Sequence, residues 1–202
     1  MQRASSFSRD QRGATAVEIA VLAPLLFGAV LSTFDIGLYF WRWNEAIQAS
    51  RIGARIAIVS DPVASDLKAM TGLETSGVDP GEPAGPYERV CTGGATCSGG
   101  VYDAAAMNRI FFGVQGADCV PGSPRSERGM CDVLPMLQTA NVTVTYRSSG
   151  VDTAGAAGAL RPLVTVRITG ANPRLVLFGR LFPATLPATE TTMLAEDLRS
   201  TA

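Results

Sequence analysis

The stretch that decides the fold is IAVLAPLLFGAVLSTFDIGLYFW, residues 19–41, in which Asp35 is the single charged residue. In a helix that rises about 1.5 Å per residue, this stretch extends about 34 Å and can cross a hydrocarbon core of about 30 Å. It is too long for a cleavable secretory signal, whose apolar region has about 7–15 residues. A core helix is the alternative, but the remaining chain, rich in Gly, Pro and Thr, would have to cover it on every side. We therefore predict a transmembrane helix over residues 14–42.

The flanks of this span differ in character. Residues 1–13 are polar, carry three arginines against one aspartate and form a predicted basic cytoplasmic leader. At the other end Tyr39, Phe40, Trp41 and Trp43 cluster as an aromatic interfacial belt, and Arg42 follows as a snorkelling anchor. The predicted exit from the bilayer is therefore near Arg42.

Helical signals continue beyond the membrane without a breaker. Ile52, Ile56 and Val59 are spaced to share one helix face, and the Asp61-Pro62 pair is the first stop, since a residue before proline is pushed away from the α region. Residues 43–60 are predicted to continue the helix outside the membrane.

Residues 61–202 are predicted to form an extracytoplasmic α+β domain. Turn-forming residues dominate 61–100, which predicts loops with one short helix at 65–72. A second short helix is expected at 101–112, capped by Asp103, and a third from Pro173 to Phe182. Residues 141–147 and 163–169 alternate as half-buried antiparallel strands, and 189–197 is a candidate last strand. The predicted fold class is α+β, with a long N-terminal transmembrane helix extending into a small antiparallel sheet domain.

Composition argues against several function classes. The 202 residues suffice for one domain plus an appendage, and a net charge of −1 gives no field that would gather nucleic acid. Histidine is absent, which removes the commonest general base and metal ligand. We expect no enzyme activity, cofactor, metal, nucleic-acid partner or small-molecule substrate. A membrane-anchored periplasmic enzyme would need a carboxylate pair or a Ser/Lys dyad, and neither is recognisable.

Four cysteines lie beyond the span, and an even number on one side of a membrane indicates disulfides in an oxidising compartment. Three pairings are possible. The local loops Cys91–Cys97 and Cys119–Cys131 are favoured because Gly-rich and Pro-rich stretches let the chain turn back. A tetrathiolate zinc site usually has closer Cys-x₂₋₄-Cys pairs. Arginines on the two sides do not decide the orientation, so the cysteines favour a cytoplasmic N-terminus and a periplasmic domain.

Small residues recur at a spacing of four in and above the span. The sets are Gly28 with Ser32, Thr33 with Gly37, and Ala49 with Gly53 and Ala57. They allow helices to approach closely, as in a bundle or filament. For Ala49, Gly53 and Ala57, packing against the chain's own sheet is an equally good explanation.

Two acidic residues in the apolar helix need an explanation. Asp35 can snorkel to the interface or pair with Arg42 two turns later, and we favour snorkelling. Glu18 lies at the inner end of the span, where a carboxylate is unfavourable, although less so than the about 2.5–3.5 kcal/mol of a charge at mid-bilayer. The simpler explanation for Glu18 is a favourable interaction with the positive end of the helix dipole, worth about 0.3–1 kcal/mol at an exposed terminus.

The sequence around Glu18 resembles a type IV prepilin processing site. A short basic leader ends at Gly13, the cut would precede Ala14, and Glu18 would be the fifth mature residue. After the cut, the new α-amine of Ala14 would lie one helical turn from Glu18, so this amine or a neighbouring subunit's could neutralise the carboxylate.

A longer set of motifs resembles the TadE-like proteins of bacterial tight-adherence (Flp) pilus systems. It comprises RGA at 12–14, AVE at 16–18, PLLF at 24–27, DIG at 35–37 and ASRIGAR at 49–55. The resemblance, which covers about residues 12–59, implies a pilin-like fold and a minor pilin or pseudopilin in the bacterial inner membrane. It also implies prepilin peptidase and other pilin and pilus-assembly proteins as partners. A membrane-anchored periplasmic binding domain that is never cut at Gly13 remains the alternative.

Overall fold

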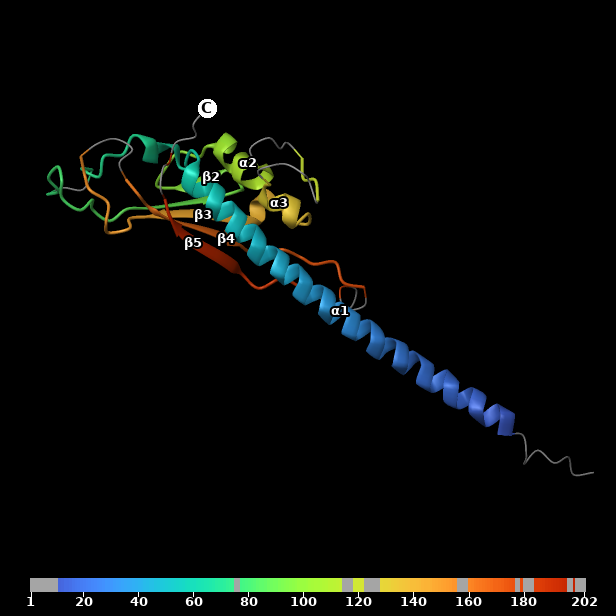
Figure 1. The fold of residues 1–202 in the computed structure, drawn as a ribbon. Coiled ribbons are helices and arrows are strands. Elements are labelled where there is room, and N and C mark those ends of the chain that lie inside the picture. The colour runs from blue at the N-terminus through green and yellow to red at the C-terminus, as the bar shows by residue number, and fades with distance from the viewer. Residues whose placement is uncertain are drawn as a thin grey trace, which may run out of the picture.

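A computed structural model describes residues 11–74, 77–113, 118–121, 128–155, 160–176, 179, 184–195 and 198. One long helix, α1 (Gln11–Val59), has its C-terminal half against a folded domain and its N-terminal half projecting away from it (Figure 1). The domain contains a five-stranded antiparallel sheet and two shorter helices among the described residues. The arrangement confirms the predicted α+β class.

Helix α1 has 49 residues and runs through Pro24 as one element. It ends at Val59, as the Asp61-Pro62 stop predicts. Of the three residues expected to share one face, Ile56 is buried and Ile52 packs against the core, whereas Val59 is 52% exposed. The rest of the buried stripe of α1 consists mainly of small residues, namely Ala46, Ala49, Gly53, Ala54 and Ala57. Small side chains let the helix backbone lie close to β4, β5 and α3, against which it packs.

The sheet has the order β2-β1-β3-β4-β5. Strands β3 (Val142–Arg147) and β4 (Leu163–Ile168) confirm the two predicted alternating segments, and the candidate last strand is present as β5 (Thr189–Leu194). Val142, Val144 and Tyr146 of β3 are fully buried, and the residues between them are only half-buried. The alternation therefore presents one apolar face to the core.

The prediction of loops and one short helix for residues 61–100 is wrong in part. Strands β1 (Glu88–Thr92) and β2 (Thr96–Ser98) form an antiparallel hairpin there, and β1 also pairs with β3. The hairpin turn includes Ala95, whose φ of 67° is in the left-handed region. The helix expected at 65–72 is a single 3₁₀ turn, η2 (Ser65–Lys68).

The helix predicted at 101–112 is confirmed as α2 (Ala104–Phe112), and the carboxylate of Asp103 accepts the N–H groups of Ala105 and Ala106 at its start. Two further short elements were not predicted, α3 (Met130–Val133) and η3 (Thr139–Asn141). The helix expected from Pro173 is not present at 173–176, which are irregular; residues 177–178 and 180–183 of that prediction lie outside the described residues.

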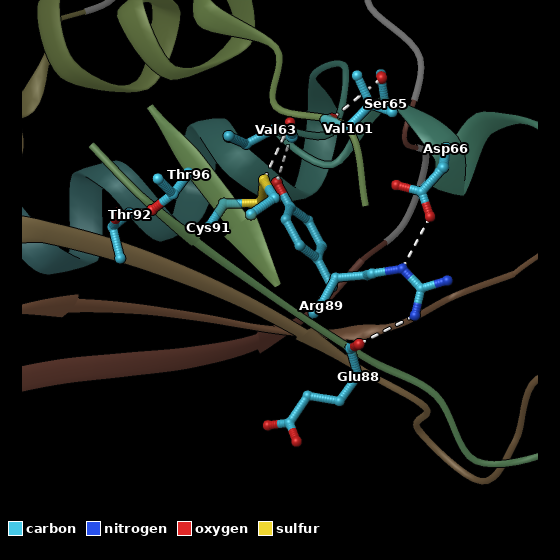
Figure 2. The surroundings of a disulfide bond; sticks show 11 residues. Val63, Ser65, Asp66, Glu88, Arg89, Cys91, Thr92, Thr96 and Val101 are labelled. Atoms are coloured by element: carbon cyan, nitrogen blue, oxygen red, sulfur yellow. Dashed lines mark hydrogen bonds and ion pairs between the residues drawn. A yellow bond between two sulfur atoms is a disulfide. The ribbon is translucent and has the colours of Figure 1, made fainter. Parts of the chain in front are cut away.

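Two disulfides join the favoured local pairs. Cys91 and Cys97 are directly opposite each other in β1 and β2, and Cys119 is bonded to Cys131 of α3. Figure 2 shows Cys91 close to Val63, whose carbonyl oxygen lies 3.8 Å from the Sγ of Cys97. Zinc binds cysteine as a free thiolate, and all four cysteines are in disulfides, so none of them is a zinc ligand in this structure.

Candidate membrane anchor and processing site

The N-terminal half of α1 is exposed and apolar on all sides. Only 6% of its most apolar 18-residue stretch is buried by the rest of the chain. The exposed large side chains in this half are Val17, Ile19, Val21, Leu22, Leu25, Leu26, Phe27, Val30, Leu31 and Phe34. A core helix would be covered by its own domain, so that alternative is excluded. The length and composition of this half are those of a single membrane anchor.

The small residues of this exposed half leave space beside the helix. A Cβ added at Gly28 or Gly37 would meet no atom within 4 Å. The hydroxyl of Ser32 donates to the carbonyl of Gly28 at 2.7 Å, so this polar group is satisfied within the helix. Val30, Phe34 and Trp41 line one shallow groove along the same face as Gly37. The space beside Gly28 is open, and packing of Gly28 and Ser32 against another helix stays a prediction.

The outer small residues have a different role. Ala49 and Ala57 are fully buried, and a Cβ at Gly53 would lie 2.5 Å from the Sδ of Met130. These three residues therefore pack against the chain's own domain. Of the two explanations that the sequence left open for this set, intramolecular packing is the one observed.

The three predicted processing residues share the first turns of α1. Gly13 and Ala14 lie within the helix, which begins at Gln11, and the first ten residues of the predicted leader lie outside the described residues. Glu18 follows Ala14 by four residues, and its side chain is exposed. Residues four apart in a helix are neighbours on one face. An α-amine created at Ala14 would therefore be within about one turn of the Glu18 carboxylate.

Asp35 does not snorkel, so the favoured prediction for this residue is wrong. Its side chain is fully buried, and its Oδ1 accepts the backbone N–H of Val176 at 2.8 Å. The partner suggested for it, Arg42, instead pairs with Glu45 at 2.7 Å on its own helix. No local feature around Asp35 indicates this contact, because Val176 is 141 residues away in the chain.

The aromatic cluster at residues 39–43 is divided between two environments. Phe40 and Trp41 remain exposed, whereas Tyr39 and Trp43 pack against the core of the domain. The Tyr39 hydroxyl donates to the carbonyl of Thr185 at 3.1 Å. One face of α1 is therefore covered by the domain from Asp35 onward, while the opposite face stays apolar and open as far as Trp41.

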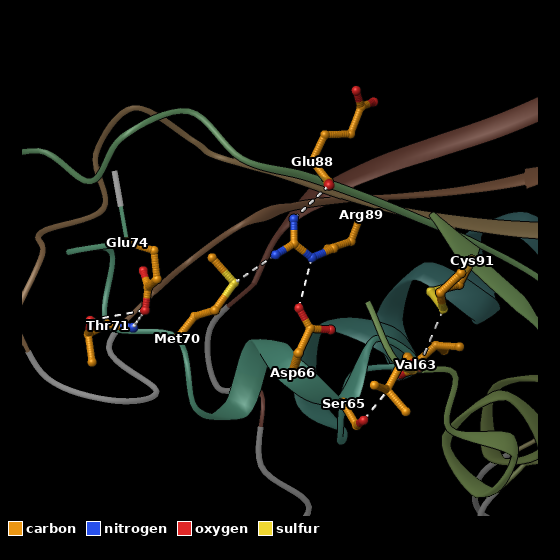
Figure 3. A network of polar contacts seen from close by, with 11 residues as sticks. Val63, Ser65, Asp66, Met70, Thr71, Glu74, Glu88, Arg89 and Cys91 are labelled. Carbon is orange, nitrogen blue, oxygen red and sulfur yellow. Dashed lines mark hydrogen bonds and ion pairs between the residues drawn. A yellow bond between two sulfur atoms is a disulfide. The ribbon is translucent and has the colours of Figure 1, made fainter. Parts of the chain in front are cut away.

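The polar groups of the outer domain serve to join its segments. Arg89 of β1 donates from Nε to Asp66 at 2.8 Å and from Nη1 to the carbonyl of Glu88 at 3.0 Å, with Met70 beside it (Figure 3). These contacts join η2 to β1, an inner strand of the sheet. Buried Asp152 likewise accepts the hydroxyl of Tyr87 at 3.1 Å, and burial together with this carboxylate raises the pKa of Tyr87. Both networks have a structural role.

Residues 13–55 match the family model described as TadE-like protein, and this match covers about a fifth of the 202 residues. The matched segment begins at the predicted processing glycine and ends within the buried stripe of α1. No curated protein and no solved structure matches the chain.

Proposed function

Residues 13–55 of this chain are a TadE-like domain, and from that premise we propose that the protein is a minor pilin or pseudopilin of a tight-adherence (Flp-type) pilus system. The family implies a pilin-like protein associated with such a pilus, and proteins of this kind are generally not catalytic. One observation carries the proposal. The N-terminal half of α1, which is exposed and apolar and has Glu18 near its start, projects from a folded domain (Figure 1).

The exposed half supports an anchor role. Residues 15–34 span about 30 Å as a helix, which equals the thickness of a hydrocarbon core. The disulfides support an oxidising compartment for the domain. The chain would then cross the bacterial inner membrane once, with its N-terminus in the cytoplasm and its domain in the periplasm.

The inner end of the helix supports processing. A prepilin peptidase would cut after Gly13, and Ala14 would become the mature N-terminus. Its ammonium group could then pair with Glu18 or with the glutamate of a neighbouring subunit. Such pairing would offset the unfavourable placement of a carboxylate at the edge of the hydrocarbon.

The apolar surface supports assembly with other helices. Gly28 and Gly37 have open space beside them. In lipid, small residues of this kind allow two helices to approach each other closely. The partners would be the apolar N-terminal helices of other pilin or pseudopilin subunits, either in the fibre or in the complex that initiates it.

A photo-crosslinking experiment in cells that carry the pilus genes tests this assignment. A crosslinking amino acid replaces Phe27, which is exposed on the anchor, or Val101, which is exposed on the domain. We expect the probe at Phe27 to capture pilin-like or pilus-assembly proteins. Capture of lipid alone from Phe27, with pilus assembly unaffected by deletion of the chain, would contradict the pilus role and favour the unprocessed anchored binding domain. The probe at Val101 shows whether the domain has further contacts.

A further inference from the structure

The connection between β4 and β5 leaves the sheet and runs along α1 toward its exposed half (Figure 1). Both limbs of this connection are hydrogen-bonded to the helix. On the first limb, the N–H of Val176 donates to Asp35 at 2.8 Å; on the second, the carbonyl of Thr185 accepts from Tyr39 at 3.1 Å. Asp35 and Tyr39 are one turn apart, so the two bonds hold the connection at one level of α1.

That level lies within the apolar part of the helix. Asp35 precedes Arg42 by seven residues, which is about 10 Å along the helix axis. On the open face, Ile36, Phe40 and Trp41 remain exposed above Asp35. If lipid covers this face up to Trp41, the connection lies at the depth of about 5–10 Å at which interfacial segments insert.

The chemistry of the connection suits this depth. Val176 is 52% exposed, and its N–H is satisfied by Asp35, as a backbone group near hydrocarbon must be. Full burial of Asp35 keeps its carboxylate away from lipid. Arg174 is exposed two residues before Val176 and lines a groove of about 690 Å³ together with Arg42. An exposed apolar side chain with guanidinium groups nearby is typical of segments that lie at the headgroup boundary.

We propose that the part of the β4–β5 connection that ends at Val176 is a second membrane contact, in which the Val176 side chain inserts into the headgroup–acyl boundary of the bilayer that α1 crosses. The Asp35–Val176 bond holds the connection against the helix at that depth. The domain is then attached to the membrane at two points, and its orientation to the surface is restricted. This inference rests on the anchoring part of the proposed function and not on the pilus assignment.

Depth-dependent fluorescence quenching tests the contact. The full chain is placed in vesicles of phosphatidylethanolamine and phosphatidylglycerol, with an environment-sensitive dye on Val176→Cys and with spin-labelled lipids as quenchers. Val30→Cys, in the span, is the positive control. Val151→Cys is the matched exposed-valine control, since residue 151 follows β3 at the end of the sheet opposite to the β4–β5 connection.

We expect a lipid quencher near the headgroups to reduce the emission from position 176, and a quencher deep in the acyl chains to reduce that from position 30. Position 151 should keep its emission with both. If position 176 behaves like 151 while 30 is quenched, the inference is overturned and the anchor stands. If position 30 is not quenched, the anchor itself fails.

A second variant tests the role of Asp35. Asp35→Ala removes the acceptor for the Val176 N–H, whereas Asp35→Asn keeps an oxygen there. We expect Asp35→Ala to lose the quenching at position 176 and Asp35→Asn to keep it, with quenching at position 30 unchanged in both. Equal quenching at 176 in all three chains would overturn the role of Asp35 in placing the connection.

Discussion

Gly53 of α1 lies directly against Met130 of α3. A Cβ added at Gly53 would come within 2.5 Å of the Met130 Sδ and within 3.2 Å of Val166 Cγ1 on β4. Both neighbours are fully buried, so they have little room to move. The helix backbone therefore lies close to the core at this point, which explains why small residues make up most of its buried stripe.

We predict that Gly53→Leu destabilises the domain by about 1–3 kcal/mol or more, because overpacking forces side chains and backbone apart. Thermal unfolding of the full chain in detergent measures the loss. Gly37→Leu is the matched control, since a Cβ at Gly37 meets nothing within 4 Å. If the two variants unfold at the same temperature, the tight helix–core contact is wrong.

The stability of the domain should fall at alkaline pH. Tyr146 is fully buried, accepts the N–H of Val63 at 3.0 Å, and burial raises its pKa above the ordinary value of about 10. The folded chain therefore holds the phenol proton more tightly than the unfolded chain. The contribution of Tyr146 to the free energy of unfolding is complete below pH 10. As the pH rises from there toward the pKa of the folded state, this contribution falls by about 1.4 kcal/mol per pH unit.

Urea unfolding between pH 8 and 11 measures this dependence. Tyr146→Phe should start from a lower stability, because the Val63 N–H loses its acceptor, but should decline less steeply above pH 10. Tyr87 contributes in the same direction in both chains. An identical alkaline slope for the two chains would show that Tyr146 is not the group responsible.

Each disulfide should contribute measurably to stability. The bonds close loops with sequence separations of 6 and 12 residues, for which the loss of chain entropy in the unfolded state corresponds to about 2–3 kcal/mol each. We expect Cys91→Ala with Cys97→Ala, and Cys119→Ala with Cys131→Ala, to lower the free energy of unfolding by about this amount. Mass spectrometry under non-reducing conditions provides the control for pairing, and disulfide-linked peptides that join Cys91 to Cys119 or Cys131 would contradict the structure.

Glu18 should matter for assembly and not for folding. Glu18→Gln leaves the proposed α-ammonium of Ala14 without a counter-charge at the edge of the hydrocarbon, where an unpaired charge is unfavourable. We expect crosslinks from Phe27 to pilus proteins to fall more than about tenfold. Glu190→Gln, an exposed carboxylate on β5, is the control and should leave the crosslinks unchanged. Equal losses in both variants would argue against a specific role for Glu18.

Periodicity and turn chemistry predicted most of the regular elements. The alternation at 141–147 and 163–169, the cap at Asp103 and the stop at Asp61-Pro62 are all local signals, and each has its counterpart in the structure. The hairpin of β1 and β2 was missed because β1 is half-exposed at most positions and β2 has three residues. A Gly-containing turn between Cys91 and Cys97 was the available signal, since a short loop of this kind favours a hairpin.

The remaining differences depend on contacts between distant residues. The spacing of Ile52, Ile56 and Val59 does not show that only Val59 stays exposed, because how far the helix is covered depends on residues far away in the chain. Asp35 is another such case. Nothing within a few residues of Asp35 indicates that a backbone N–H from the β4–β5 connection will cover it.

The mass of the mature N-terminus tests the central claim most directly. The full chain is expressed with and without a prepilin peptidase, as wild type, as Gly13→Leu and as the control Gly28→Leu, which changes a glycine with open space beside it. We predict an N-terminus at Ala14 in the wild type and in Gly28→Leu when the peptidase is present, and an uncut chain in Gly13→Leu. An uncut wild-type chain in membranes that contain active peptidase would contradict the account.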